Sequence, residues 1–281
     1  MAGIELGYLA PHPWIMVAGE REAGHHAATT TAFRRAAGEV ARRGVDLLLV
    51  ASPHWPPAAS FRVGGAPRYA GTLDAFLPHV NAALPPAHRR DLPPVPYDFP
   101  GEPELAARLL DAGREAGLPV QLEPRPEALD HGSIVPILYL NPEGRLPVLL
   151  LSVQEGPAAR SRAWGEIVAR EAGRLGRRAA FVASGTLSHR FLFDRPNALW
   201  PEGEAWDRRV LEALTGGSPE AVLGYTEAEV AAGQVEEGGL HGLFTLLGAL
   251  GPGARGSVLS YEGIVGVGSP IVRFEAAPKA A

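Results

Sequence analysis

Short, largely apolar runs alternate along this chain with longer segments in which apolar and charged positions are mixed. The short runs are typical of strands that are covered on both faces of a sheet, and they span residues 4–10, 45–51, 146–153 and 179–183. The mixed segments have the spacing of amphipathic helices, and they span residues 27–43, 104–116 and 158–176. Helices are also expected over most of 202–250, followed by two strands around Gly263 to Gly268.

This alternation of strands and helices predicts an α/β fold. We expect a single domain over residues 1–281, with a central, mostly parallel or mixed sheet that is flanked by helices on both faces. Prolines are dense between residues 84 and 103. We expect this stretch to be a Pro-rich surface excursion and not a linker between domains.

Histidines follow the ends of three predicted strands: His12 after 4–10, His54 after 45–51 and His189 after 179–183. Ligands of open α/β sheets bind at the carboxyl ends of the strands. The three imidazoles are therefore expected at one site, where His12 and His54 are placed to hold a metal ion. His131, in a polar turn, is a fourth candidate. The remaining histidines are interpreted as structural or surface residues: His25, His26, His79, His88 and His241.

Composition narrows the kinds of chemistry that this chain can perform. It contains no cysteine, which excludes disulfides, thiolate metal sites and cysteine nucleophiles. The formal net charge is −5 and the basic residues are scattered, which argues against binding to nucleic acid or to an anionic membrane. No apolar run approaches the length of a membrane span, and no signal peptide is recognisable, so a cytoplasmic location is expected.

Two neutral imidazoles and one carboxylate form the facial triad that suits non-haem Fe(II) and leaves positions open for substrate and dioxygen. The candidate carboxylates are Glu236 and Glu237, which come before an apolar helix that continues to Leu250. A glutamate in the first turn of a helix also complements the helix dipole. Capping of the helix therefore stays open as an alternative to metal binding.

Four motifs occur in order along the chain: Ala10-Pro11-His12-Pro13, Ser52-Pro53-His54-Trp55, Asp130-His131-Gly132 and Ser184-Gly185-Thr186-Leu187-Ser188-His189. Their order and strand context resemble the class III (LigB-type) extradiol ring-cleavage dioxygenases over nearly the whole chain. The stretch from Tyr97 to Ala106 also looks like the family's segment ahead of the Asp-His-Gly turn.

The resemblance implies an Fe(II)-dependent enzyme of aromatic catabolism that inserts both atoms of O₂ into a catechol-like ring and opens it. It implies metal ligands at His12, His54 and Glu237, with Glu236 as the alternative third ligand. It also implies that His189 is the acid/base residue and that His131 is a second active-site histidine. An imidazole, whose ordinary pKa is about 6.5, can accept a catechol proton at neutral pH.

Trp55, Tyr97 and Phe99 are candidates to line a flat aromatic pocket, although packing in the core or in loops is the favoured interpretation of each. A homo-oligomer is expected for an enzyme of this size, and a small partner subunit, as in some relatives, is an alternative.

Two other function classes fit parts of the pattern. The same scaffold also resembles the MEMO-type proteins, which share the fold and some histidines and are regarded as binding or signalling partners. In that case the pocket would bind metal without ring cleavage. A zinc hydrolase also uses two histidines, a glutamate and an activated water, but the His-Glu-x-x-His string that such enzymes often carry is absent here. Zinc therefore stays an alternative metal.

Overall fold

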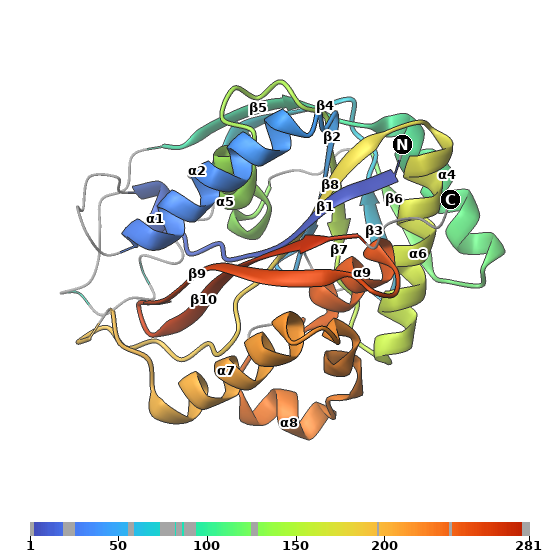
Figure 1. Cartoon of the computed structure of the whole chain (residues 1–281). Coiled ribbons are helices and arrows are strands. Elements are labelled where there is room, and N and C mark those ends of the chain that lie inside the picture. The colour runs from blue at the N-terminus through green and yellow to red at the C-terminus, as the bar shows by residue number, and fades with distance from the viewer. Residues whose placement is uncertain are drawn as a thin grey trace.

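A central sheet of eight strands organises the molecule (Figure 1). The computed structural model describes residues 3–18, 26–55, 59–73, 82, 86, 94–124, 129–195, 197–235 and 238–276. In spatial order the strands are β6 (Val120–Glu123), β3 (Phe61–Gly64), β7 (Val148–Ser152), β2 (Leu47–Ser52), β8 (Arg178–Ser184), β1 (Gly3–Ala10), β10 (Val267–Glu275) and β9 (Arg255–Ile264).

The middle of the sheet is parallel and its flanks are mixed. β7, β2, β8 and β1 run in one direction, with Val50 beside Leu150 and Val182, and Ala10 beside Ser184. β10 pairs antiparallel with β1, and β9 with β10. The predicted α/β fold with a large mixed sheet is confirmed, and the carboxyl ends of β1, β8 and β2 lie next to each other at one edge.

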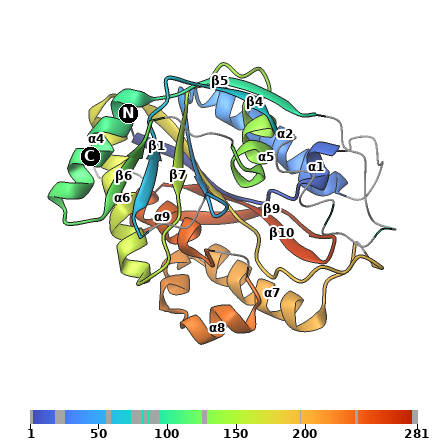
Figure 2. The same cartoon turned by 180° about the vertical axis from the view of Figure 1, so that it is seen from behind.

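Helices cover both faces of this sheet (Figures 1 and 2). One core contains Leu47 and Leu49 of β2, and the other contains Leu48 and Val50 of the same strand. Successive side chains of a strand point to opposite faces, which explains why this run is apolar throughout. The first core is covered by α4 (Pro103–Glu115), α6 (Ala158–Arg174), α7 (Pro201–Thr215) and α9 (His241–Leu250), and the second by α1 (Ile15–Ala18), α2 (Ala27–Arg42) and α5 (His131–Leu140).

The predicted helical region 202–250 is divided into several elements. Between α7 and α9 lie the 3₁₀ helix η3 (Pro219–Gly224) and α8 (Glu227–Ala232). Figure 1 shows α7 and α8 beneath the hairpin of β9 and β10, and α7 contacts both of these strands.

The Pro-rich stretch differs in part from the predicted excursion. Its C-terminal part contains β5 (Pro96–Pro100), which pairs antiparallel with β4 (Arg68–Thr72) in a separate two-stranded sheet. Tyr97 and Phe99 are buried while Pro96 and Asp98 are exposed, which is the two-residue alternation of a half-buried strand. The prolines at both ends of β5 concealed this alternation. Residues 84, 85 and 87–93 lie outside the described part of the chain.

Within the described residues, no helix is both long enough and apolar enough to cross a membrane.

An ion pair joins α2 to the C-terminal strand β10. Arg273 Nε donates a hydrogen bond of 2.7 Å to Glu39 Oε2, and about a fifth of each side chain is exposed. The hydrogen bond from Arg273 is the largest cause that lowers the pKa of Glu39, and burial opposes it. A carboxyl with a lowered folded-state pKa stabilises the fold above its unfolded pKa, and this contribution is lost as the pH falls through the folded value.

We therefore expect Glu39→Gln to reduce the free energy of unfolding by about 1 kcal/mol at pH 7. The difference from the unsubstituted protein should begin to shrink below the ordinary glutamate pKa of about 4.3 and vanish as the pH falls through the lowered folded-state pKa of Glu39. Urea denaturation at pH 7 and pH 3 measures it, and an equal difference at both pH values contradicts the assignment. The control is Glu143→Gln, since the Glu143–Arg145 pair is exposed and should contribute nothing measurable.

Candidate metal centre

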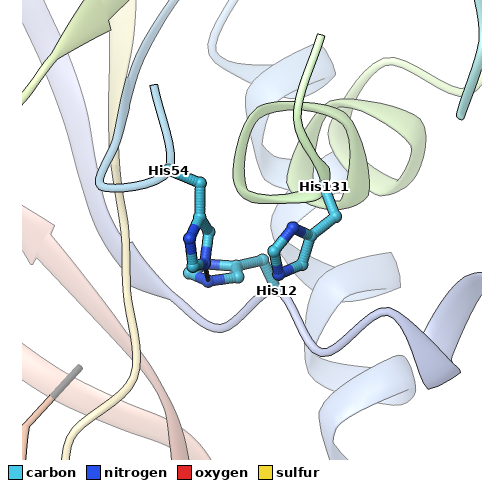
Figure 3. Close-up of side chains that lie close together, drawn as sticks. All are labelled: His12, His54 and His131. Carbon is cyan, nitrogen blue, oxygen red and sulfur yellow. Dashed lines mark hydrogen bonds between the residues drawn. The ribbon is translucent and has the colours of Figure 1, made fainter. Parts of the chain in front are cut away.

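The parallel strands place two histidines at the same edge of the sheet. His12 follows β1 and His54 follows β2, and both strands flank β8. The ring centroids of His12 and His54 are 4.8 Å apart, and their Nε2 atoms are 2.9 Å apart (Figure 3). Two strands joined through a common parallel neighbour thus bring together residues that are 42 positions apart in the sequence.

His131 completes a cluster of three imidazoles. Its ring stacks on that of His54 with centroids 4.1 Å apart, and it lies edge-on to that of His12 at 5.1 Å. One nitrogen from each of the three rings lies within 4.8 Å of the others, which makes the group capable of holding a metal ion. Figure 3 shows the three side chains converging from separate segments.

The polar turn predicted around His131 is the first turn of α5. Asp130 caps this helix, because its Oδ1 accepts hydrogen bonds from Ser133 N at 2.9 Å and from Ser52 Oγ at 2.6 Å. Ser52 is the last residue of β2, so this carboxylate joins the segment of His54 to that of His131. A Cβ on Gly132 would lie 2.5 Å from Ser52 Oγ and 3.0 Å from the His54 ring. Only glycine permits this close approach.

The environment of His131 favours a neutral ring. Burial is the largest cause that lowers its pKa well below the ordinary value, and the rings of His12, His54 and His189 add to the effect. A neutral imidazole has a lone pair that can bind a metal or accept a hydrogen bond.

Ser184, the last residue of β8, orients His12. Its hydroxyl donates to the Gly132 carbonyl at 2.5 Å and lies 2.8 Å from His12 Nδ1. The single hydroxyl proton is committed to the carbonyl, so Nδ1 of His12 must be the donor to Ser184. His12 Nε2 then carries the lone pair and faces His54. A hydrogen bond of this kind fixes the tautomer and the orientation of a metal-binding histidine.

We expect Ser184→Ala to weaken metal binding by about 10- to 100-fold, because the His12 ring loses the partner that fixes its tautomer. Titration of metal-free protein with a divalent metal measures the change. Ser161→Ala is a matched control, since Ser161 makes the same kind of bond to His241 Nδ1 at 2.9 Å outside the cluster. Equal losses in the two variants would show that Ser184 has no special role.

A cavity of about 420 Å³ borders the three rings. It is lined by His12, Pro13, Trp14, Ile15, His54, His131, Thr186, His189, Phe191, Phe193, Ile264, Val265 and Val267. His189 thus faces the same cavity as the metal cluster, while Trp55, Tyr97 and Phe99 are buried away from its lining. The packing interpretation of those three aromatic residues agrees with this arrangement.

Asp207, a buried acid that the sequence pattern did not indicate as functional, fixes the loop that carries His189. Asp207 of α7 is fully buried and accepts hydrogen bonds from Ser188 N and Ser188 Oγ, both at 2.8 Å, and from Tyr261 Oη at 2.7 Å. Burial raises the pKa of Asp207. Its signal in the sequence is an acidic residue on the apolar face of a helix, between Trp206 and Val210.

The candidate carboxylates Glu236 and Glu237 lie outside the described residues. Their described neighbours are close to the cluster on both sides. Gln234 O accepts a hydrogen bond from His189 N at 2.9 Å. A Cβ on Gly238 would lie 3.3 Å from Cβ of Pro53, the residue before His54.

The other histidines divide as follows. His241 bonds to Ser161 and lies outside the cavity lining, and His26 is buried near the start of α2. This agrees with their interpretation as structural residues. His25, His79 and His88 lie outside the described part of the chain.

The donor set fits a divalent metal ion. Two nitrogens bound at right angles to one ion at about 2.1 Å lie about 3 Å apart, close to the 2.9 Å between the two Nε2 atoms. These features define an α/β protein with a histidine cluster suited to metal at the carboxyl ends of its parallel strands. The family model described as the catalytic LigB subunit of aromatic ring-opening dioxygenase matches residues 6–272. The chain belongs to this family.

Individual relatives agree with that membership. The chain is 26% identical to the 2-aminophenol 1,6-dioxygenase beta subunit of a Pseudomonas species, over 95% of this chain and 92% of the relative. It is 28% identical to the 3,4-dihydroxyphenylacetate 2,3-dioxygenase of Escherichia coli, over 74% of this chain and 75% of the relative. These relatives support a ring-cleaving dioxygenase.

Two further matches carry no activity in their names. Protein CA_C1420 of Clostridium acetobutylicum is 26% identical over 96% of this chain, which spans only 57% of that protein's length. The crystal structure of the uncharacterized protein JW3007 from Escherichia coli K12 superposes with a TM-score of 0.67 and 19% identity, covering 96% of this chain and 99% of the other. The second match shows the common fold.

Proposed function

We propose that this protein is an Fe(II)-dependent extradiol dioxygenase that opens a catechol-like ring with O₂. The observation that carries the proposal is the meeting of three imidazoles, with two Nε2 atoms 2.9 Å apart, at the wall of a largely apolar cavity. An apolar cavity with a few convergent polar groups is the usual form of a small-molecule site.

We assign His12, His54 and Glu237 as the metal ligands. Glu237 is supported by the positions of its neighbours, because Gln234 bonds to the segment of His189 and Gly238 lies against Pro53. Two histidines and one carboxylate favour Fe(II), with zinc as the alternative metal. Glu237→Gln should reduce bound iron far more than Glu236→Gln, and the reverse order would exchange the two roles.

Fe(II) held by His12, His54 and Glu237 would supply a redox-active centre that binds the substrate oxygens and dioxygen. The protein residues bind and deprotonate the substrate around that site. His189 lines the cavity and accepts a hydroxyl proton from the catechol, while His131, kept neutral by burial, accepts or donates a hydrogen bond at the reacting oxygens. The apolar wall excludes water, which strengthens these polar contacts. Both oxygen atoms enter the product as the carbon–carbon bond beside the diol breaks.

Oxygen uptake tests the proposal directly. Protein purified without air and loaded with Fe(II) is mixed with catechols and aminophenols in an oxygen electrode. We expect one O₂ consumed per substrate and a yellow ring-opened product. Iron that stays bound without any oxygen uptake across the panel contradicts a ring-cleaving function.

His189→Phe distinguishes an enzyme from a MEMO-type binding protein. In an enzyme, loss of a general acid/base lowers kcat by about 100-fold or more, while iron content is unchanged because His189 is outside the ligand set. In a binding protein, the substitution has little effect on partner binding.

We also propose that the protein is a homo-oligomer. Light scattering after size-exclusion chromatography measures its oligomeric state.

A further inference from the structure

We propose that the cavity contains an apolar subsite that binds an uncharged hydrophobic substituent on the substrate ring. The apolar subsite is defined by Trp14, Ile15, Phe191, Phe193, Ile264 and Val265. The inference rests on the proposed function and extends it to the substrate class, which is an alkyl- or aryl-substituted catechol or aminophenol.

An aromatic pair leads from the histidines to the mouth of the cavity. The Phe191 ring lies edge-on to the His189 ring, with centroids 4.9 Å apart, and stacks on the Phe193 ring at 5.5 Å with an interplanar angle of 13°. Phe191 is 50% exposed, whereas His12 is only 2% exposed. The pair therefore extends the cavity wall from the buried cluster towards solvent. An aromatic substituent can stack there.

The loop that carries this pair is fixed to the hairpin of β9 and β10. Leu192 N donates a hydrogen bond of 2.8 Å to Val265 O, and a Cβ on Gly266 would lie 2.5 Å from Arg190 O. The two sides of the subsite thus hold each other in place, which makes the wall preformed.

The turn between β9 and β10 has a valine, Val265, at a position where asparagine or glycine is usual. Ile264 pairs with Val267, so Val265 and Gly266 form a two-residue turn, with φ of 53° and 87°. Turns with positive φ at both positions favour Asn-Gly, and a β-branched residue is strained there. Val265 nevertheless places its side chain on the cavity wall. Strain of this kind is characteristic of functional sites.

The absence of cationic side chains among the described lining residues disfavours anionic substituents. Among the described residues, the cavity lining includes no lysine, arginine, aspartate or glutamate side chain. A carboxylate placed against Phe193 and Val265 would lose its water without gaining a cationic partner, which is strongly unfavourable. An alkyl or phenyl group gains affinity by the same transfer.

Calorimetric titration of the Fe(II)-loaded protein without oxygen tests the inference. The ligands are catechol, 3-phenylcatechol, 4-phenylcatechol and 3,4-dihydroxyphenylacetate. We expect one phenyl isomer to bind about tenfold more tightly than catechol or better, and the carboxylate ligand to bind more weakly than catechol. Binding of the carboxylate as tight as that of both phenyl isomers overturns the subsite.

Val265→Asn provides the sharpest variant because it should leave the turn intact. Asparagine suits this backbone, so the melting temperature should stay equal or rise, while the preference for the phenyl ligand over catechol falls about threefold or more. Phe193→Ala should also reduce that preference. Val258→Ala is the control, since Val258 is 42% exposed and is not part of the cavity lining. Unchanged preference in both subsite variants contradicts the assignment.

Failure of this inference is distinguishable from failure of the proposed function. If catechol binds and is cleaved but a phenyl group brings no gain in affinity, only the apolar subsite is wrong. If no catechol binds to the iron-loaded protein, the proposed function itself fails.

Discussion

Replacement of His12 by alanine is expected to abolish iron binding and ring cleavage together. His12 contacts both His54 and His131 and is almost completely buried. Loss of a partner that merely orients a ligand costs about 10- to 100-fold in affinity, so loss of the ligand itself should cost about 1,000-fold or more. Metal analysis and oxygen uptake measure the two effects.

The matched control for this substitution is His241→Ala. His241 is also a partly buried histidine bonded to a serine, but it lies outside the cavity. Its replacement should leave the iron content unchanged. Ser161→Ala, which removes the same hydrogen bond without removing the ring, is a second control. Normal iron content in folded His12→Ala protein would remove His12 from the ligand set.

Replacement of Gly165 by alanine is expected to destabilise the fold strongly. Gly165 on α6 lies against α9, where its Cβ would be 1.9 Å from Thr245 O and 2.7 Å from Ala249 N. The approach is mutual, because a Cβ on Gly248 of α9 would lie 2.0 Å from Arg162 O. Backbone atoms cannot rotate away, so the two helices must separate. We expect a loss of about 3 kcal/mol in the free energy of unfolding.

Gly38→Ala is the control, and it should have the opposite sign. Gly38 lies within α2, and its Cβ would meet only the flexible end of Arg42, at 3.2 Å. Alanine is favoured over glycine inside a helix by up to about 1 kcal/mol, so this variant should be equally stable or more stable. Urea denaturation measures both variants. A Gly165→Ala protein as stable as the Gly38→Ala protein contradicts the close packing of α6 and α9.

This packing also matters for the candidate site. α9 begins at His241, shortly after Glu237 and Gly238. The contact between α6 and α9 therefore fixes where α9 begins, and with it the position of Gly238 against Pro53, the residue before His54. A loosened contact should reduce iron affinity as well as stability.

Several features followed from local patterns in the sequence. Apolar runs such as 45–51 identified buried strands because a parallel strand covered on both faces has no polar side. The expectation that His12 and His54 lie close together rests on a similar reason, since parallel strands of one sheet end at the same edge. In the structure the centroids of these two rings lie 4.8 Å apart.

Other features depended on contacts between distant segments, which local patterns do not encode. The strand β5 was concealed by its prolines, and its pairing with β4 became visible only in the fold. The apolar subsite combines the loop after β8 with the turn between β9 and β10, and no spacing in the sequence relates Phe193 to Val265.

The amino-acid pattern alone therefore specified the α/β class and the histidines at the strand ends, because burial and strand direction act over a few neighbouring residues. The assembly of the cluster needed the fold. His131 joins His12 and His54 only because Asp130 binds Ser52, Gly132 permits close approach and Ser184 bridges two segments. These interactions have short ranges in space but join residues that are far apart along the chain.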